Sequence, residues 1–516
     1  MIDWIHPAVF FFGAAAVLPF VKGKARSALL LTVPVLGFLS LLFASQGIHG
    51  VIPFMGRELI FGRVDRLSLV FGYAFTISAF GSIVYSLHVQ RSGEHMAALL
   101  YAGSALGAVF AGDLFTFLMF WEIASFSSVF LIWLKGEKAS SAAGMRYLFV
   151  HIFGGLCLLG GIVIYTNTGG SIAFDKLPQE GLGPMLILIG FLLNAAVPPL
   201  HSWLADAYPE ATPTGIVFLS VFTTKTAIYA LIRGFPGMPL LIVLGAIMAV
   251  LGVMYAVNEN NCQRVWCYHL ISQNGYMVTG IGIGTELGLN GAVSLAFTNI
   301  LYKALLMMGI SSVFVMTGRR KQTELGGLYR AMPWTFVFFV IGGFAIAGVP
   351  PLAGFISKAI VETAATETHR GWVVLMLVFG ACGTWLHPLK LIYNVFLGGD
   401  KKIPAADPPL NMLLGMGFIS ALCILIGLFP NLLYRVLPYP MEYQPYTPAH
   451  LVGGLQVLSL TFLVFMFFLP KLHGENKISL DTDWFYRKAT VGFLWLTRRI
   501  EARELETKPI ETKPIE

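Results

Sequence analysis

Runs of about 20 apolar residues recur from end to end of the chain, separated by short polar or basic loops. That length is what an α-helix needs to cross a bilayer. The pattern predicts an all-α polytopic membrane protein with about 14–15 transmembrane helices. The expected spans are 5–21, 27–45, 66–88, 95–111, 113–135, 145–165, 184–208, 212–233, 239–257, 264–284, 291–317, 334–365, 370–396, 410–430 and 450–470.

Two of these runs are interrupted by the same four residues. Val197-Pro198-Pro199-Leu200 and Val349-Pro350-Pro351-Leu352 lie 152 residues apart. Adjacent prolines remove backbone donors and break a helix, and broken backbone at membrane depth is tolerated only where it is buried in protein or lines a water-filled cavity. Paired breaks of this kind point to an ion or substrate site at a repeat interface. The pattern favours a transporter core over a simple anchor.

The same spacing relates ionisable positions in the two halves of the chain. Adding 152 carries His151 onto Lys303 and Asp206 onto Lys358, while Glu122 falls on Asn274. These coincidences, which are confined to a few residues, predict two duplicated five-helix units. Because the number of helices per unit is odd, the two copies are expected to be inverted relative to one another.

The chain is expected to divide into five segments. They are 1–95 (N-terminal transmembrane helices), 96–235 (first five-helix repeat), 236–396 (second repeat), 397–470 (C-terminal helices) and 471–516. Residues 46–65 resemble a short hairpin outside the membrane. In 471–516, aromatic residues mixed with arginine and lysine predict an amphipathic helix at the inner interface, followed by a disordered cytoplasmic tail.

Composition agrees with a membrane location. Hydrophobic residues make up 56% and charged residues 12% of the chain, whereas an ordinary soluble domain has about 25% charged residues. The net charge of +7 lies largely in alternate short loops (22–26, 135–146, 319–321 and 401–402), where it sets topology and does not indicate nucleic-acid binding. We expect a multi-pass protein of the bacterial inner membrane, with an uncleaved first span, the N-terminus outside and the C-terminus in the cytoplasm.

The candidate chemistry lies in the few ionisable groups inside the spans, because such groups are costly in a bilayer and usually face the bundle interior. Glu122, Lys225, Lys303 and Lys358 are the main candidates. Joined by water, such groups can load and release protons near neutral pH. The structural alternatives are an ion pair, or a long side chain that reaches the interface.

Several further groups are weaker candidates. His151, His201, His269 and His387 lie within or beside spans, and each is either a proton carrier or a hydrogen-bonded structural histidine. Lys390, one turn after His387, is a further candidate for the path. Asp206 and Glu210 flank the end of the first broken span, where they either take part in the path or cap the following helix.

Five sequence motifs stand out, namely Phe120-Trp121-Glu122, 199–207 (PLHSWLADA), 225–233 (KTAIYALIR), 302–306 (YKALL) and 354–358 (GFISK). Together they resemble the antiporter-like subunits shared by Mrp-type multisubunit cation/proton antiporters and respiratory complex I. The resemblance covers roughly residues 60–430. The region 208–215 and the ending near 483–486 are most similar to the bacterial D-type subunits of Mrp antiporters.

The resemblance implies proton conduction along a hydrated polar axis through the middle of the membrane, without a bound cofactor. Glu122 matches the family's essential glutamate on the fifth helix. Lys225 and Lys303 match lysines on the eighth and eleventh helices, and Lys358 matches the terminal lysine on the broken twelfth helix. The implied partners are the other subunits of a hetero-oligomeric membrane complex, with H+ and Na+ or K+ as transported ions.

The chain departs from the family pattern at three positions. Asn194 stands where most relatives carry a lysine that pairs with the glutamate, so it can only orient water or hydrogen-bond Glu122, and Lys225 is the alternative partner. Asn299 replaces a common histidine, and Gln263 replaces a common basic residue. These changes affect the expected proton path but not the expected fold.

The leading functional hypothesis is a proton-translocating subunit of an Mrp-type antiporter that exchanges Na+ or K+ for protons, with Glu122 and Lys225 as a switch and Lys303 and Lys358 as an onward relay. The alternatives are a proton-pumping membrane subunit of a complex I-like dehydrogenase or energy-converting hydrogenase, an energising subunit for inorganic-carbon uptake, and an isolated channel or scaffold. No nucleophile elbow, phosphate loop or metal-binding quartet is present in the sequence, and the five cysteines form no C-x-x-C pair. We therefore expect neither covalent catalysis nor a metal site.

Overall fold

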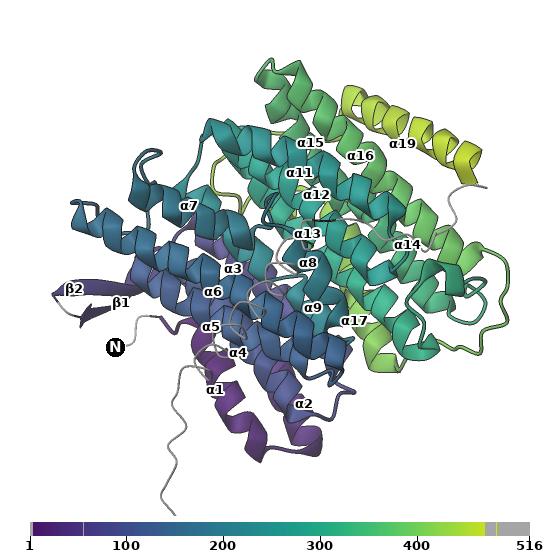
Figure 1. Ribbon diagram of the computed structural model, residues 1–516, viewed down its shortest axis with the longest axis horizontal. Helices are drawn as coiled ribbons and strands as arrows, with labels where there is room; N and C mark the ends of the chain where they lie inside the picture. Colours follow the sequence, from purple (N-terminus) through teal and green to yellow (C-terminus); the bar gives the residue numbers. More distant parts are fainter. Residues whose placement is uncertain (1–3, 55, 470–480, 482–483, 485–516) are drawn as a thin grey trace, which may run out of the picture. The chain divides into compact units, whose positions relative to one another are not determined.

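The computed structural model describes residues 4–54, 56–469, 481 and 484. The chain separates into two compact units, Met1–Lys477 and Ile478–Glu516. The first unit is a helical bundle (Figure 1), and the second lies almost wholly outside the described residues, as does the expected interfacial helix. The helices are α1 (Pro7–Val17), α2 (Gly23–Leu42), α3 (Arg66–Ser86), α4 (Ser92–Phe110), α5 (Leu114–Trp133), α6 (Lys138–Asn167), α7 (Leu182–Asn194), α8 (Ser202–Ala207), α9 (Gly215–Leu219), α10 (Thr223–Gly234), α11 (Pro239–Asn258), α12 (Cys262–Ile283), α13 (Glu286–Thr317), α14 (Pro333–Ala347), α15 (Ala353–Glu367), α16 (Gly371–Leu391), α17 (Leu410–Leu428), α18 (Asn431–Tyr434) and α19 (Pro448–Phe468).

The helices confirm the predicted all-α membrane class. Among the described residues, ten helical segments are long and apolar enough to cross a bilayer, and Pro7–Phe20, Leu182–Asn194 and Pro333–Ala347 are shorter apolar helices. Every expected span overlaps a helix or a pair of consecutive helices. Side chains of α12 and α13 are buried almost throughout, whereas α19 is mostly exposed on the outside of α16. Polar groups on α12 and α13 therefore lie inside the bundle.

The expected hairpin is also present. Strands β1 (Gly47–Phe54) and β2 (Arg57–Val64) pair in antiparallel register, with Gly47 opposite Val64. The Ile60 amide donates to the carboxylate of Asp113 at 2.7 Å, and this carboxylate also caps α5 by accepting from the Phe115 and Thr116 amides. The hairpin is thus attached to the beginning of a membrane helix.

Both double prolines interrupt a helix with the same backbone geometry. At the first break Ala196 has φ 58°, and the Val197 and Ala196 amides donate to the Leu192 and Leu193 carbonyls. At the second break Gly348 has φ 82°, and the Val349 and Gly348 amides donate to the Phe344 and Ala345 carbonyls. This pair of bonds around a left-handed residue is a Schellman motif. The two breaks are therefore equivalent at the spacing of 152 residues that relates the prolines.

The expected span at 212–233 is present, since Gly215–Gly234 is long and apolar enough to cross a bilayer. Its helix is not continuous, however, because a break at 220–222 separates α9 from α10. The break lacks proline and so gives no strong sequence signal. Two hydroxyl groups satisfy backbone groups that it releases. The Thr223 amide donates to the Tyr101 hydroxyl at 2.8 Å, and the Ser220 hydroxyl donates to the Val217 carbonyl at 2.7 Å. Lys225 consequently lies in the first turn of a helix that begins inside the bundle.

The basic loops lie on one face of the first unit, as their alternation predicts. Arg26 donates to the Gln90 carbonyl, and Arg91 of the same loop donates to the Leu134 carbonyl. Arg320 lies 3.9 Å from Glu137, and Lys401 donates to the Thr323 carbonyl. These contacts connect the first turn of α2 to the loops that follow α3, α5, α13 and α16. We call this surface the basic face.

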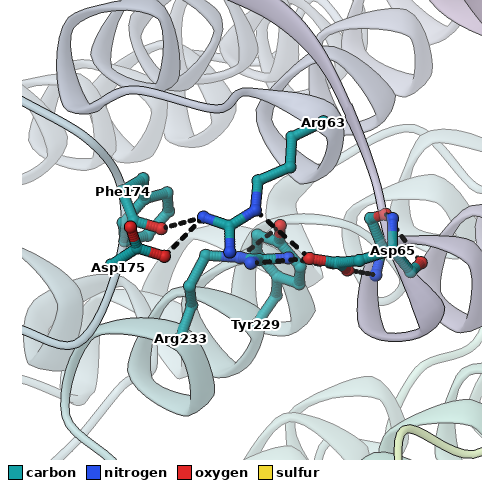
Figure 2. A network of polar contacts seen from close by, with 7 residues as sticks. Arg63, Asp65, Phe174, Asp175, Tyr229 and Arg233 are labelled. Atoms are coloured by element: carbon teal, nitrogen blue, oxygen red, sulfur yellow. Dashed lines mark hydrogen bonds and ion pairs between the residues drawn. The ribbon is translucent and has the colours of Figure 1, made fainter. Parts of the chain in front are cut away.

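An ionic network joins the hairpin to the ends of three other segments (Figure 2). Arg233, at the end of α10, lies 2.9 Å from Asp65, which caps α3. Arg63 of β2 lies 3.3 Å from Asp65 and 2.7 Å from Asp175 in the loop between α6 and α7. Burial acts to raise the pKa of Asp65, but Arg233 and Arg63 outweigh it, so the pKa is lowered. Asp65 is therefore ionised at neutral pH.

Candidate proton pathway

Glu122 lies on α5 against the glycines of α6. A Cβ atom added to Gly155 would overlap its Oε1 atom, so the glycine provides the space that the carboxylate occupies. The side chain is half-buried, and Oε1 has no hydrogen-bond partner among the residues that the structure describes. This arrangement presents an unpaired carboxyl oxygen at the α5–α6 contact.

Asn194 and His151 lie at the same stretch of α6 that Glu122 contacts. Asn194 ends α7, and a Cβ atom added to Gly154 would be 3.7 Å from its Oδ1 atom. The fully buried His151 places Nδ1 2.9 Å from the Tyr147 carbonyl and stacks on Tyr147, with 3.9 Å between ring centroids. Asn194 Oδ1 and His151 Nε2 have no partner within the described part of the chain. Buried polar atoms of this kind are usually satisfied by ordered water.

His201 occupies the broken backbone between α7 and α8. It is buried, with its ring 6.2 Å from that of Tyr255. Two residues later, the Trp203 indole donates to the Leu193 carbonyl at 3.0 Å and lies 4.6 Å from the His151 ring. Trp203 thus closes the first break against α6 and α7.

Lys225 is fully buried and bound to neutral oxygen atoms. Its amine donates to Asn274 Oδ1 at 2.9 Å and to the Thr224 hydroxyl at 3.3 Å. Asn274 in turn donates to the Ala195 carbonyl at 3.0 Å. The amide therefore connects the lysine of α10 to the first helix break.

The expected pairing of Glu122 with Lys225 is not seen in the described residues. Neither a hydrogen bond nor an ion pair joins them, and Asn194 does not bond to Glu122 either. A direct switch between the two groups would thus require water or a side-chain movement between them.

Lys303 lies on α13 in the centre of the bundle. Its amine donates to the Trp266 carbonyl of α12 at 3.0 Å and lies 5.1 Å from the centre of the Trp266 ring. Lys225 and Lys358 are both within electrostatic reach of this amine. The three lysines therefore form a series across α10, α13 and α15.

Asn299 and Gln263, which depart from the family pattern, bind other side chains near Lys303. Asn299 donates to the Tyr302 hydroxyl at 3.1 Å, and Gln263 donates weakly to Ser311 at 3.5 Å. The Tyr302 hydroxyl donates to Gln273 at 3.1 Å. These contacts form a buried polar chain that crosses from α13 to α12.

Lys358 lies just beyond the second break, and its amine donates to the Ile346 carbonyl at 2.7 Å near the end of α14. A carbonyl at a helix C-terminus is a favourable partner for a cation. A cavity of about 550 Å³ lies beside this lysine between α15, α16 and α19. Glu362, one turn after Lys358, and His450 of α19 also line it.

His269, His387 and Lys390 lie together at the α12–α16 contact. The two histidine rings are 4.7 Å apart between centroids. Lys390, one turn after His387, donates to the Val257 carbonyl at 2.7 Å. Of the weaker candidates, these three form a second cluster near Lys303.

Capping is the wrong interpretation for Asp206 and Glu210. Asp206 forms a two-pronged contact with Arg146, in which Nε and Nη2 donate at 2.7 and 2.9 Å. Glu210 lies 3.1 Å from Lys135 and 3.7 Å from Arg320. Bidentate arginine–carboxylate contacts are strong and geometrically specific. These acids therefore connect the first broken helix to the basic face.

Sequence reasoning misses two residues of the candidate pathway. Asn274 stands out only as the repeat counterpart of Glu122, because an amide cannot titrate and its partner lies in another helix. Glu362 carries a usable signal, since it is one helical turn after Lys358.

Within 4–54 and 56–469 the structure contains no group of three or more His, Cys, Asp or Glu side chains that could hold a metal ion.

Comparison with known proteins identifies the family. Residues 111–384 match the family described as NADH:quinone oxidoreductase/Mrp antiporter, transmembrane. The chain belongs to this family of membrane proteins.

Several proteins from different organisms are similar to the chain. An uncharacterized protein of Methanocaldococcus jannaschii is 27% identical, covering 82% of this chain and 94% of its own length. Na+/H+ antiporter subunit A1 of Staphylococcus haemolyticus is 27% identical, but the match spans only 59% of that protein. Hydrogenase-4 component B of Escherichia coli is 26% identical, covering 80% of this chain and 68% of its own length.

Solved structures share the fold. A chain of the Mrp complex from Dietzia sp. DQ12-45-1b has a TM-score of 0.76 at 21% identity, covering 89% of this chain and 98% of that chain. A chain of an archaeal respiratory complex, the membrane-bound sulfane sulfur reductase, has a TM-score of 0.79 at 21% identity, covering 99% and 96%. A chain of respiratory complex I from Thermus thermophilus has a TM-score of 0.75 at 20% identity, covering 88% and 99%.

Proposed function

We propose that this chain is a proton-translocating membrane subunit of an Mrp-type multisubunit antiporter that exchanges Na+ or K+ for protons, and that it takes the place of the D-type subunit in that complex. The other subunits of the complex would be its partners, and H+ and the cation its transported ions.

One observation carries the proposal. Lys225, Lys303 and Lys358 are buried in series, and each amine is held by a neutral oxygen atom. An ion pair with a carboxylate would favour the charged amine, whereas a neutral acceptor can hold the amine in either protonation state. A proton can therefore leave Lys225 or Lys303 without stranding a paired negative charge. Lys358 differs, because the carboxyl group of Glu362 lies within electrostatic reach of its amine.

The geometry supports an order of transfer along the membrane. Glu122 would exchange protons with Lys225 through water near Asn194 and His151, and the proton would pass to Lys303 and then Lys358. The cavity beside Lys358, with Glu362 and His450 in its lining, would supply the opening away from the central axis. Protons hop through water over such gaps, so direct contact between successive side chains is not required.

Transport in everted vesicles tests the proposal. The chain is expressed with its neighbouring genes in an antiporter-deficient host, and collapse of a preformed proton gradient is followed on adding Na+ or K+. We expect cation-dependent collapse that Glu122→Gln abolishes. Glu180→Gln, at an exposed loop position, is the matched control and should retain activity. Full exchange by an assembled Glu122→Gln complex would contradict the proposal.

The second candidate is a proton-pumping subunit of a redox enzyme. It is favoured by the similarity to hydrogenase-4 component B and by the fold shared with a respiratory membrane complex over 99% of this chain. The same vesicles separate the two functions. Proton uptake driven by quinone or hydrogen turnover, without any cation requirement, would identify the redox-driven pump.

A further inference from the structure

His269 and His387 form a buried pair of polar rings that the proposed pathway does not use. Their planes are nearly perpendicular, at 88°, and both side chains are fully buried. Both His269 ring nitrogens lack a hydrogen-bond partner in the described part of the bundle, whereas one His387 nitrogen reaches the Gly383 carbonyl of its own helix and the other has no partner there. Buried polar atoms without a protein partner are typically satisfied by ordered water. The pair is therefore a candidate site for bound water between α12 and α16.

One end of this site reaches Lys303. His269 lies one turn after Trp266, whose carbonyl accepts from the Lys303 amine at 3.0 Å. The Trp266 and His269 rings are 5.2 Å apart between centroids. Lys303 is also within electrostatic reach of both histidines. Water at the rings would thus be adjacent to the central lysine.

The other end reaches the basic face. The Lys390 amine donates to the Val257 carbonyl in the last turn of α11, two residues before Glu259. The Glu259 carbonyl accepts from Gln322 at 2.8 Å, and Gln322 accepts from Asn394 at 2.9 Å. Gln322 follows Arg319, Arg320 and Lys321 of the basic face. Polar groups consequently continue from the histidines to the surface.

The backbone of α16 is irregular over the same stretch. Pro388 lies between His387 and Lys390 and has no N–H to donate to the preceding turn. The helix then continues as a π-helical turn, η4 (Ile392–Leu397). Such turns occur frequently at functional sites, and irregular backbone in a membrane helix is tolerated where water or protein satisfies it.

We infer that His269, His387 and Lys390 form a water-linked branch that carries protons between Lys303 and the basic face. The branch gives the second repeat its own opening on that face, separate from the cavity beside Lys358. It rests on the proposed function for the direction of proton flow, but the bound water can be tested without transport.

Radiolytic hydroxyl-radical footprinting of the assembled wild-type complex tests for that water, because side chains next to ordered water are oxidised even when buried. His95 is the matched control, since it is 3% exposed and its Nε2 lies 3.0 Å from the Val89 carbonyl. We expect His269 and His387 to be modified at least tenfold faster than His95. Equal rates at the three histidines would overturn the inference.

Transport by His387→Phe then tests conduction. We expect at least a tenfold loss of cation-driven proton exchange in an assembled complex, with His95→Phe retaining most of it. If His269 and His387 are modified rapidly but His387→Phe transports at the wild-type rate, water is bound at the site and the inferred branch is overturned. Absence of exchange in the wild type would instead contradict the proposed function, because the footprinting result does not depend on exchange. If His387→Phe fails to assemble, footprinting of the wild type still decides whether water is bound.

Discussion

The Lys225 amine donates a 2.9 Å hydrogen bond to Asn274 Oδ1, and Asn274 occupies the position that the repeat of 152 residues pairs with Glu122. The second repeat therefore carries a neutral amide where the first carries a carboxylate. This amide binds the lysine of the first repeat, and its own nitrogen reaches the Ala195 carbonyl beside the first break. The two repeats thus meet at this bond.

Replacing Asn274 with alanine should lower proton exchange at least tenfold. A hydrogen bond to a charged group contributes about 1.5–3 kcal/mol, and the buried amine of Lys225 would lose its nearest acceptor. Exchange is measured in everted vesicles. Thr279→Ala is the control, because the Thr279 hydroxyl is also buried on α12 but donates only to the Gly275 carbonyl of its own helix. Equal activity of the two variants would show that the Asn274 contact is dispensable.

Asn274→Asp should also reduce exchange, for a different reason. The carboxylate would keep an acceptor at the same place but would form an ion pair that holds the proton on Lys225. We expect normal assembly with slow exchange. Exchange at the wild-type rate would contradict the idea that a neutral acceptor matters.

Gly155→Ala should displace Glu122 and abolish exchange while leaving the helix intact. Alanine favours a helix by about 0.5–1 kcal/mol relative to glycine, so the loss would come from the overlap with Glu122 Oε1. Gly160→Ala is the matched control, since a Cβ atom there meets nothing within 4 Å on the same helix. In Gly155→Ala, the shorter side chain of Glu122→Asp should restore part of the activity.

Asp65→Asn should destabilise the complex by about 1–3 kcal/mol, because it leaves the buried Arg233 without its carboxylate partner. The loss is limited because water partly screens the Asp65 side chain. Thermal unfolding in detergent measures the loss. Asp175→Asn should cost less, since the Asp175 side chain is 62% exposed.

The stability difference between wild type and Asp65→Asn should depend on pH, because the pKa of Asp65 is lowered. Burial acts to raise this pKa, but Arg233 and Arg63 lower it by a larger amount. A depressed carboxyl pKa stabilises the fold above the unfolded pKa of about 3.9, and the contribution is lost as pH falls through the folded value. The gap in stability between wild type and Asp65→Asn should be constant between about pH 5 and 8. It should shrink only in more acidic solution.

Glu362→Gln should slow exchange severalfold if protons leave through the cavity beside Lys358. The amide cannot carry a proton, although it preserves the size of the side chain. Glu367→Gln is the control, because Glu367 is exposed at the end of the same helix. Similar rates for both variants would remove Glu362 from the path.

The membrane helices could be predicted from the sequence because their apolar runs are long and the two proline breaks repeat. The break at 220–222 could not, since it depends on the hydroxyl of Tyr101 from a distant helix. Local sequence contains no signal for such a partner.

The titratable candidates could likewise be found, since a charged residue within an apolar run is conspicuous. Their partners could not be predicted. Arg146 reaches Asp206 across 60 residues, and Lys225 reaches Asn274 across 49. Contacts of this kind depend on how the helices pack, which residue spacing along one helix does not reveal.

The series of lysines has a consequence for how many protons the path can hold. Lys303 is within electrostatic reach of both Lys225 and Lys358, and the hydrogen-bond acceptors of all three amines are uncharged, although Glu362 lies within electrostatic reach of Lys358. In a low-dielectric interior, like charges repel strongly. Filling one position therefore opposes filling its neighbour, so protons would cross singly, and each would have to move on before the next could enter.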